Sequence, residues 1–479
     1  MSKIDEIALD GSEPSLNGNG EGLANRLKAQ PTKPAFDVAK CGFVHHTFEN
    51  KYYENKGNVW GPATVDDIKR AFRVVYDMDA DDQDAAIFAI RREAQIHQAV
   101  NVAGCKAGVQ EDKRGHRYLV VQSHELVEPI RGDWSIIREI IESMFGEEQT
   151  PYVYAWLQWA YLCYETRTLA PGQLFVMVGP QNCGKTLVQE RIISRLLGSN
   201  TARPLDYLMG KTEFNADLIA NASWGMSDEI SDMNWQQRKI LTEGCKEAMV
   251  NTEKRLRGLY NNPCVVDMVP RISCAINWSS LEALPLFEEG MSDKMILFKV
   301  EKSSRLPTAE EPREEFGTKI DDALPGFAYF LKNEFTVTED ISETEFNVRF
   351  NLKAWHHPDI LEKISDVKRH VFLAEMLFKW RDLYSHEGSP LDMWSELTKY
   401  DTESASSVKT LAPTVRIFGT IMTDLAEATK DSFCHGVKVI KPRRGHSGRR
   451  YQVQFEDVAK QAEVKDVVAK IISARRSRR

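Results

Sequence analysis

The stretch GPQNCGKT at residues 179–186 constrains the fold more than any other part of the sequence. The apolar run from Leu174 to Val178 before it predicts a buried strand, and the amphipathic run from Leu187 to Leu197 predicts a helix after it. The two glycines let backbone N–H groups turn inward, and the helix N-terminus adds partial positive charge. A strand, a glycine-containing turn and a helix in this order predict a phosphate-binding loop.

The residues of this loop predict a site for a nucleoside triphosphate, with ATP and Mg²⁺ as the expected cofactors. Lys185 is expected to reach the outer phosphates, and the Thr186 hydroxyl to join the magnesium shell. The competing interpretation is a chance turn before a helix, which the correct flanks on both sides disfavour. The residues expected to line the nucleotide are Gly179, Pro180, Gln181, Asn182, Cys183, Gly184, Lys185, Thr186 and Leu187.

Two further polar segments follow apolar runs. Ser223 to Met226 predicts a short strand that leads into Asp228 and Glu229. Asp228 would hold magnesium, directly or through water, and Glu229 would polarise the attacking water. Ile272 to Ile276 predicts a buried strand that ends at Asn277, whose amide can orient that water. Read in isolation, the acidic pair is a solvated loop and Asn277 is an ordinary turn residue.

Short apolar runs alternate with helical patterns from Leu174 to about Val300, which predicts an α/β core with a sheet covered by helices. The composition divides the chain further, because the N-terminal stretch is polar and rich in Gly, Ser and Asn. We expect a disordered tail over 1–35, an N-terminal α+β domain over 36–150, the α/β core over 151–305, a helical region over 306–405 and a winged-helix-like basic domain over 406–479.

The region before the core predicts a hairpin within FVHHTFENKYYENKGNVWGP and a helix that begins at Thr64. Ile68, Phe72 and Val75 are expected on one face of that helix. The acids Asp77 and Asp79 resemble a polymerase metal pair, but the interpretation we favour is a helix end running into an acidic loop. The chain is therefore expected not to make primers itself.

The charge of the chain is unevenly distributed. The whole sequence of 479 residues has a net charge of −8, so any surface for nucleic acid must be local. Between Lys438 and Arg479 there are 13 Lys and Arg against 4 Asp and Glu. There, a helix over 415–428 is followed by two short strands around KPRRGHSG, which predicts the wing of a winged helix. The expected phosphate contacts are Arg443, Arg444, Arg449 and Arg450.

Other sequence features set the expected cellular context. The eight cysteines are scattered without metal-ligand spacing, so neither disulfides nor a zinc site is expected. No apolar run approaches the ~18 residues of a membrane span, and no signal peptide is evident. We therefore expect a cytoplasmic protein without membrane association, in a bacterial host cell.

Together, the motif at 179–186, the acidic pair and Asn277 resemble the superfamily 3 helicases of DNA viruses, phages and plasmids. The likeness is greatest to the helicase part of the poxvirus/phage-type primase-helicases, and YYENKGNVWGPATVDDIKRAF is similar to the domain that precedes their ATPase. The resemblance implies a P-loop, AAA+-like, three-layer ATPase core that assembles into a ring, usually a hexamer. In such rings ATP hydrolysis drives translocation along single-stranded DNA.

The resemblance also implies a hairpin that lines the pore, which VNTEKRLRGLYNNPCVVDMV fits. The best pore candidates are Lys254, Arg255 and Arg257, against the alternative of a solvated charged strand. Family members often carry an arginine finger after the Asn strand, where this chain has Lys294. Lysine is a point charge rather than a bidentate fork, so Arg271 and Arg305 are considered as substitutes.

The leading hypothesis is an ATP-dependent DNA helicase or translocase in the replication of a phage or mobile element. Its expected partners are single-stranded and forked DNA, further copies of the chain in a homo-hexamer, and a separate primase or polymerase. The alternative is an ATP-switched DNA-binding initiator or regulator that unwinds nothing. An unrelated P-loop kinase is a third possibility, but it requires lid arginines near the loop, and the sequence has no such cluster.

Overall fold

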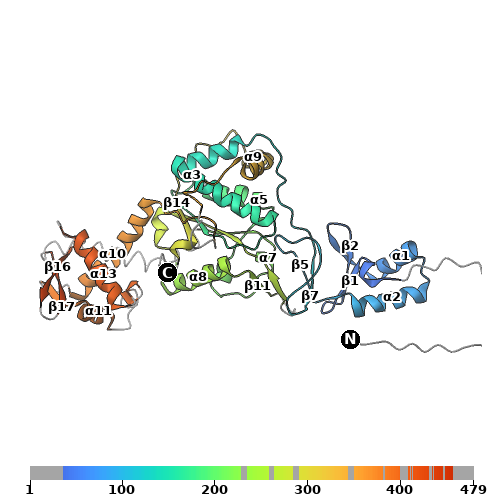
Figure 1. Ribbon diagram of the computed structural model, residues 1–479, viewed down its shortest axis with the longest axis horizontal. Helices are drawn as coiled ribbons and strands as arrows, with labels where there is room; N and C mark the ends of the chain where they lie inside the picture. Colours follow the sequence, from blue (N-terminus) through green and yellow to red (C-terminus); the bar gives the residue numbers. More distant parts are fainter. Residues whose placement is uncertain are drawn as a thin grey trace, which may run out of the picture. The chain divides into compact units, whose positions relative to one another are not determined.

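The protein is described by a computed structural model (Figure 1) that covers residues 36–456 with gaps. The chain divides into two compact units, one comprising Met1–Asn55 and Gly61–Gln95 and the other Lys56–Trp60 and Ile96–Arg479. Each unit is treated by itself. The residues between 36 and 456 that lie outside the description are 228–232, 234, 258–263, 284–290, 343–349, 381–382, 384, 400–407, 410, 413, 431–433, 435 and 446–447.

The first unit packs two helices against a small sheet with strand order β3-β2-β1-β4. The expected helix begins at the Thr64 capping box, and Ile68 and Phe72 are buried as predicted. Val75 is 70% exposed, so its prediction as a core residue was wrong. The apolar stripe instead continues to Tyr76, four residues after Phe72, and the two rings lie 5.7 Å apart. The elements are η1 Val38–Lys40, β1 Phe43–His46, β2 Lys51–Asn55, β3 Trp60–Ala63, α1 Val65–Tyr76, α2 Ala80–Glu93 and β4 Gln95–Ile96.

Two sequence predictions for this unit are confirmed. Strands β1 and β2 form an antiparallel hairpin, with Phe43 opposite Glu54. Asp77 ends α1 in the left-handed region at φ 51°, and Asp79 caps α2 by accepting a hydrogen bond from Asp82 N at 2.9 Å. The predicted helix end is therefore confirmed, but the acidic stretch expected to be a loop is largely helical, because α2 begins directly after Asp79.

A five-stranded parallel sheet with order β14-β8-β13-β10-β9 forms the centre of the second unit. The strands predicted at 174–178, 223–226 and 272–276 are present, so the expected α/β fold class is confirmed. Because a parallel sheet is buried on both faces, these strands are nearly continuous apolar runs. The strands are β8 Leu174–Gly179, β9 Thr201–Ala202, β10 Ser223–Met226, β13 Arg271–Asn277 and β14 Met295–Lys299.

Helices cover both faces of this sheet (Figure 1). The connection from β8 to β10 and the one from β10 back to β13 run in opposite directions across the sheet, so right-handed crossovers place their helices on opposite faces. The two helices predicted before β8 are the halves of α3, which breaks at Gly146 with φ 70°. The helices are α3 Ser135–Glu165, α4 Lys185–Leu187, π-helical η2 Val188–Ile193, α5 Ser194–Leu196, α6 Leu205–Leu208, α7 Ala216–Ile219, α8 Trp235–Val250, η4 Trp278–Ala283, η5 Ser292–Lys294, α9 Arg313–Tyr329 and π-helical η6 Phe330–Glu334.

Two smaller sheets accompany the central one. One has order β5-β7-β6, and the other is the antiparallel hairpin β11–β12, which is the hairpin predicted before the Asn strand. Within the hairpin, Glu253 is opposite Asp267 and Leu256 is opposite Cys264. The strands are β5 Gln98–Val100, β6 Gly108–Glu111, β7 Arg117–Val120, β11 Glu253–Leu256 and β12 Cys264–Asp267.

The C-terminal part has its own apolar core, built around Phe372, Met422 and Tyr451. Its order is helix, strand, two helices and two strands, with sheet order β15-β17-β16, which is the arrangement of a winged helix. The helix predicted over 415–428 is confirmed. The predicted loop KPRRGHSG is instead largely strand, because the hairpin pairing continues to Gly445 and Gly448. The elements are α10 Pro358–Trp380, β15 Ser385–Gly388, α11 Pro390–Thr398, α13 Val415–Ala428, β16 Val437–Gly445 and β17 Gly448–Phe455.

All eight cysteines carry free thiols. Among the described helices, none combines the length and the apolar character needed to cross a bilayer.

Replacing a helical glycine with alanine is expected to change the free energy of unfolding in opposite directions at two positions, Gly244 and Gly419. In Gly244→Ala the new Cβ would lie 2.3 Å from the backbone oxygen of Leu208, so we expect a loss of about 1–3 kcal/mol in the free energy of unfolding. In Gly419→Ala the nearest atoms, on Pro390, are 3.9 Å away, so we expect a gain of about 0.5–1 kcal/mol. Thermal and denaturant unfolding of both variants measure the difference, and a destabilised Gly419→Ala protein would contradict the packing described.

Candidate functional site

The predicted phosphate loop joins the buried strand β8 to the helix that begins with α4. Asn182 at φ 56° and Gly184 at φ 113° adopt left-handed backbone conformations, which curl the loop tightly. A side chain at Gly179 would place its Cβ 2.2 Å from the backbone oxygen of Val300, so only glycine fits there. Pro180, Gln181, Asn182 and Thr186 are exposed, whereas Cys183 and Lys185 are buried. The outer surface of the loop is therefore open to a ligand.

The ammonium group of Lys185 lies inside the loop, surrounded by oxygen atoms. Its Nζ donates to Pro180 O at 2.6 Å, to Gly179 O at 3.2 Å and to Asn277 Oδ1 at 3.0 Å. A buried ammonium group needs such acceptors, since an unpaired buried charge is costly. Phosphate oxygens are acceptors of the same kind and carry negative charge.

Asn277 stands where the sequence expected it, at the C-terminal end of β13. The parallel register of β13 and β8 sets Asn277 opposite Gly179, the first residue of the loop. The side chain is buried and contacts Lys185, 92 residues earlier in the sequence. The structure thus brings together the loop lysine and the strand-ending amide that the sequence singled out separately.

Asp228 and Glu229 lie outside the described residues. The strand before them, β10, runs parallel to β13, with Met226 opposite Cys274. The carboxyl ends of parallel strands meet at one edge of a sheet, so the chain leaves β10 at the edge that carries the loop and Asn277.

The segment after β14 covers the phosphate loop. Ser303 N donates to Cys183 O at 3.1 Å, and an ideal Cβ at Gly184 would lie 3.3 Å from Leu306 Cδ2. Arg305, considered as a substitute finger, makes two hydrogen bonds to Glu311, at 2.7 and 3.0 Å. Hydrogen bonds from Arg305 and Lys319 lower the pKa of Glu311 to about 2. Arg305 is therefore held by its own chain.

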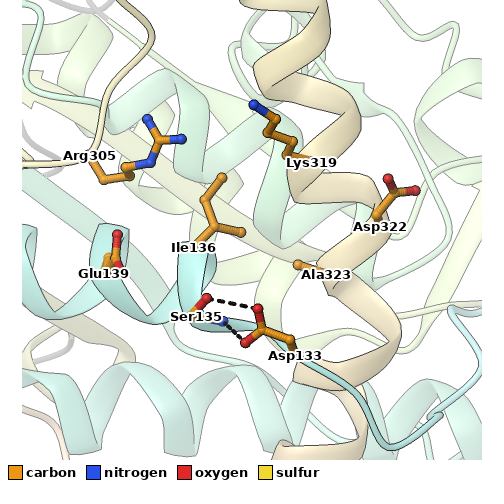
Figure 2. Close-up of a pocket in the computed structure, with 8 residues that line it drawn as sticks. All are labelled: Asp133, Ser135, Ile136, Glu139, Arg305, Lys319, Asp322 and Ala323. Atoms are coloured by element: carbon orange, nitrogen blue, oxygen red, sulfur yellow. Dashed lines mark hydrogen bonds between the residues drawn. The ribbon is translucent and has the colours of Figure 1, made fainter. Parts of the chain in front are cut away.

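Beside this segment lies an open cleft of about 500 Å³ (Figure 2). Figure 2 shows Arg305 and Lys319 reaching over Ile136 from the two sides of the cleft. At its floor, Asp133 caps α3 by accepting hydrogen bonds from the backbone and the hydroxyl of Ser135, each at 3.0 Å. The cleft is lined by Asp133, Ser135, Ile136, Glu139, Arg305, Lys319, Asp322 and Ala323.

Lys294 and Arg271 lie at the other edge of the sheet from the loop. Lys294 directly precedes β14, whose first residue is opposite Leu174, the first residue of β8. The side chain of Lys294 is 14% exposed and pairs with Asp293 at 2.8 Å. Arg271 begins β13 and is almost fully buried, donating to Ala170 O at 3.0 Å. Because its side chain is buried and held by its own chain, Arg271 is not available as a substitute finger for a neighbouring subunit.

The predicted pore hairpin is β11–β12, but its three cations differ in their surroundings. Arg255 is exposed, and Arg257 is half-buried and pairs with Glu213. Lys254 is 5% exposed and donates to Ala248 O at 3.1 Å and to Asn251 O at 2.6 Å. It caps the C-terminus of α8, and burial lowers its pKa to about 8. The structure therefore removes Lys254 from the candidate DNA contacts.

Asp112, which the sequence did not single out, anchors this hairpin. Its carboxylate accepts hydrogen bonds from Arg114 N at 2.8 Å, His116 N at 2.9 Å and Val265 N at 3.1 Å. Burial alone would raise the pKa of Asp112, but these hydrogen bonds outweigh it and lower the pKa to about 2. An Asp-Lys-Arg-Gly turn is the only signal in the sequence, and it does not reveal the contact with a strand 153 residues away.

The C-terminal hairpin places arginines opposite one another. In the antiparallel register Arg443 is opposite Arg450, and Arg444 is opposite Arg449. The register therefore gathers four arginines at the end of this hairpin. Arg450 also pairs with Glu387 at 3.3 Å.

Comparison with known proteins gives only distant likenesses. No family model and no curated protein match the sequence. An apo structure of the NrS-1 C-terminal region is 10% identical and covers 87% of this chain and 98% of that chain, with a TM-score of 0.46. A second apo structure of that region is 11% identical over 88% and 97%, with a TM-score of 0.47. The structure of SCCmec type IV Cch, an active helicase, is 11% identical over 81% and 73%, with a TM-score of 0.26.

The low pKa of Asp112 gives a pH-dependent prediction. A carboxylate whose pKa is depressed on folding adds stability above its usual pKa of 3.8, and this is lost as the pH falls towards 2. We expect Asp112→Asn to lower the free energy of unfolding by about 2 kcal/mol at pH 7, and by progressively less below pH 4. Denaturant unfolding between pH 7 and pH 3 measures this, with the exposed Asp322→Asn as control. A difference that stayed constant with pH would refute the assignment.

Proposed function

We propose that this chain is an ATP-dependent DNA helicase or translocase of the superfamily 3 type. The observation that carries the proposal is the sheet edge where the phosphate loop and Asn277 meet through Lys185, at 3.0 Å, next to the strand that leads into Asp228 and Glu229. A hairpin that exposes Arg255 and an arginine-rich wing in the same chain favour a nucleic-acid motor over a small-molecule kinase.

The residues present fit a magnesium–ATP complex, which would supply the phosphoanhydride bond that is cleaved. The curled loop exposes Thr186 at the start of its helix and keeps the Lys185 ammonium within reach of bound oxygens. In our proposal Lys185 exchanges the loop carbonyls for phosphate oxygens, and Thr186 and Asp228 hold magnesium. Glu229 accepts a proton from the attacking water, while the Asn277 amide orients that water.

Two surfaces are proposed for DNA. Arg255 and Arg257 on the β11–β12 hairpin would contact the backbone of a single strand, as in the pore of a ring. The second surface is the wing between β16 and β17, where the paired arginines would neutralise phosphates. We propose that the ring is a homo-hexamer, in which Lys294 would act on the nucleotide of the neighbouring subunit.

The exposed face of α13 favours the motor over an origin-specific initiator. In helix-turn-helix proteins the corresponding helix reads base edges in the major groove. Here the exposed charged residues of α13 are Arg416, Asp424 and Glu427, so this helix presents one cation, against the four arginines of the wing. We infer contact with phosphates through the wing, without base readout, in the replication of a phage or mobile element. A separate primase or polymerase is the proposed partner.

The catalytic part of the proposal is tested with Lys185→Ala. We expect wild-type protein to hydrolyse ATP faster with single-stranded DNA and to separate a forked duplex, and the variant to lose on the order of 10²-fold or more in turnover. Lys302→Ala is the matched control, because this exposed lysine lies in the segment that covers the loop. Wild-type hydrolysis without unwinding would favour the initiator, and no hydrolysis at all would reject both.

The DNA part is tested with the quadruple variant of Arg443, Arg444, Arg449 and Arg450. Changing all four to Ala should weaken binding to single strands and flatten its dependence on salt, by up to roughly 0.7 in log–log slope per lost phosphate contact. Changing all four to Lys keeps the charge and should retain most of the affinity. Fluorescence anisotropy at several salt concentrations, with DNA of varied sequence, measures this. A strong preference for one duplex sequence would contradict binding without base readout.

A further inference from the structure

Gln189 is a buried polar residue in the helix after the phosphate loop, and the site described above does not use it. Its exposed fraction is 0%. It lies in the π-helical turn Val188–Ile193, between α4 and α5. Single π-turns inside helices are rare and often occur at functional sites. The wider turn changes the direction in which the side chain leaves the helix, which here is towards the sheet.

The side-chain amide of Gln189 connects the loop helix to two strands. Its Nε2 donates to Met226 O at 3.1 Å and to Ser273 Oγ at 3.0 Å. Met226 is the last residue of β10, and Ser273 lies on the neighbouring strand β13. The approach is close: an ideal Cβ at Gly225 would be 3.6 Å from Gln189 Nε2. One amide therefore contacts the backbone two residues before Asp228.

Strand β10 needs this contact because its outer neighbour is short. Strand β9 pairs only with Ser223 and Trp224 of β10, so in the described residues no strand lies beside Met226 on that edge. The Gln189 amide supplies a donor to the end of β10 where the ladder with β9 has stopped. The other end of the amide, Oε1, is buried and has no partner among the described residues. An acceptor in this state is available to a backbone N–H group of the following segment.

We propose that Gln189 is a positioning residue that sets the acidic segment relative to the phosphate loop. This inference rests on the proposed ATP hydrolysis. The helix of Gln189 begins at Lys185 and Thr186, so a shift of that helix when nucleotide binds is transmitted through the amide to Met226. Gln189 acts through its contacts with Met226 and Ser273. Its loss should slow hydrolysis, because Asp228 and Glu229 are misplaced, while the loop still binds nucleotide.

The test compares Gln189→Met, which keeps the length and removes the amide, with Ser194→Ala. Ser194 is a matched control, since its hydroxyl is equally buried and bonds to Gln189 O at 2.8 Å and Ser223 Oγ at 2.8 Å but does not contact Met226. We expect Gln189→Met to lower kcat on the order of 10²-fold, with affinity for a fluorescent ATP analogue changed less than about twofold. Ser194→Ala should lower Tm and keep kcat.

Two milder variants guard against misfolding. Ser273→Ala removes one acceptor of the Gln189 amide, so it should also lower kcat and keep the affinity for nucleotide, with a smaller loss of kcat. Gln189→Glu cannot donate when ionised but can when protonated, so its turnover relative to wild type should rise as the pH falls. Equal losses in Gln189→Met and Ser194→Ala, or affinity falling together with kcat, would overturn the inference. A turnover of Gln189→Glu relative to wild type that did not change with pH would also overturn the inference.

Hydrogen exchange without nucleotide separates this inference from the proposed function. The amides of residues 226–234, which lie beyond the contact of Ser194 with Ser223, should exchange faster in Gln189→Met than in wild type, and at the wild-type rate in Ser194→Ala. Wild-type protein that hydrolyses no ATP would reject the proposed function, whereas the exchange result would still decide the role of Gln189. Unchanged exchange in Gln189→Met would reject that role even in an active enzyme.

Discussion

The contact between the Lys185 ammonium and Asn277 Oδ1, at 3.0 Å, is the interaction on which the rest of the site depends. It exists because two parallel strands end in register, with Gly179 opposite Asn277, and because Val300 leaves room only for glycine at the first loop position. In the water-poor interior such a charge-assisted hydrogen bond is strong, and leaving either partner alone would be costly. At this sheet edge Lys185 thus connects the loop after β8 to the end of β13. This edge is also the place where a ligand could replace the internal acceptors of the lysine.

Most of the architecture around the contact between Lys185 and Asn277 could be predicted from the sequence, because the sequence patterns that indicate these elements are local. Buried parallel strands appear as apolar runs, and a glycine-bearing turn between a strand and a helix has few alternatives, so the β8 loop and the position of Asn277 were predicted correctly. Capping residues are equally local, and Thr64 begins its helix as the sequence indicates. The C-terminal helix over 415–428 and the two strands that meet at Gly445 and Gly448 were likewise predicted from local patterns.

The surroundings of individual charged side chains could not be predicted, because they depend on where neighbouring elements end and how they pack. Lys254 and Arg255 are neighbours on one strand, yet alternation turns Lys254 inward onto the end of α8 and leaves Arg255 exposed. Whether the inward position carries a capping lysine or a pore contact depends on where α8 ends, which the hairpin pattern does not contain. Arg305 is held by Glu311, and Asp112 by a strand 153 residues later. Gln189 was missed because one polar residue in a helix normally signals only a solvated face.

The buried cap on α8 has a mechanical consequence. Helix α8 starts at Trp235, just after the acidic segment, and its 16 residues span about 24 Å. At its far end the Lys254 ammonium donates hydrogen bonds to Ala248 O and Asn251 O. These bonds fix the hairpin to the end of the helix. A helix attached in this way moves as a stiff unit, so that a tilt at its start displaces the residues at its end. A displacement at the start of α8 would therefore move the hairpin that carries Arg255.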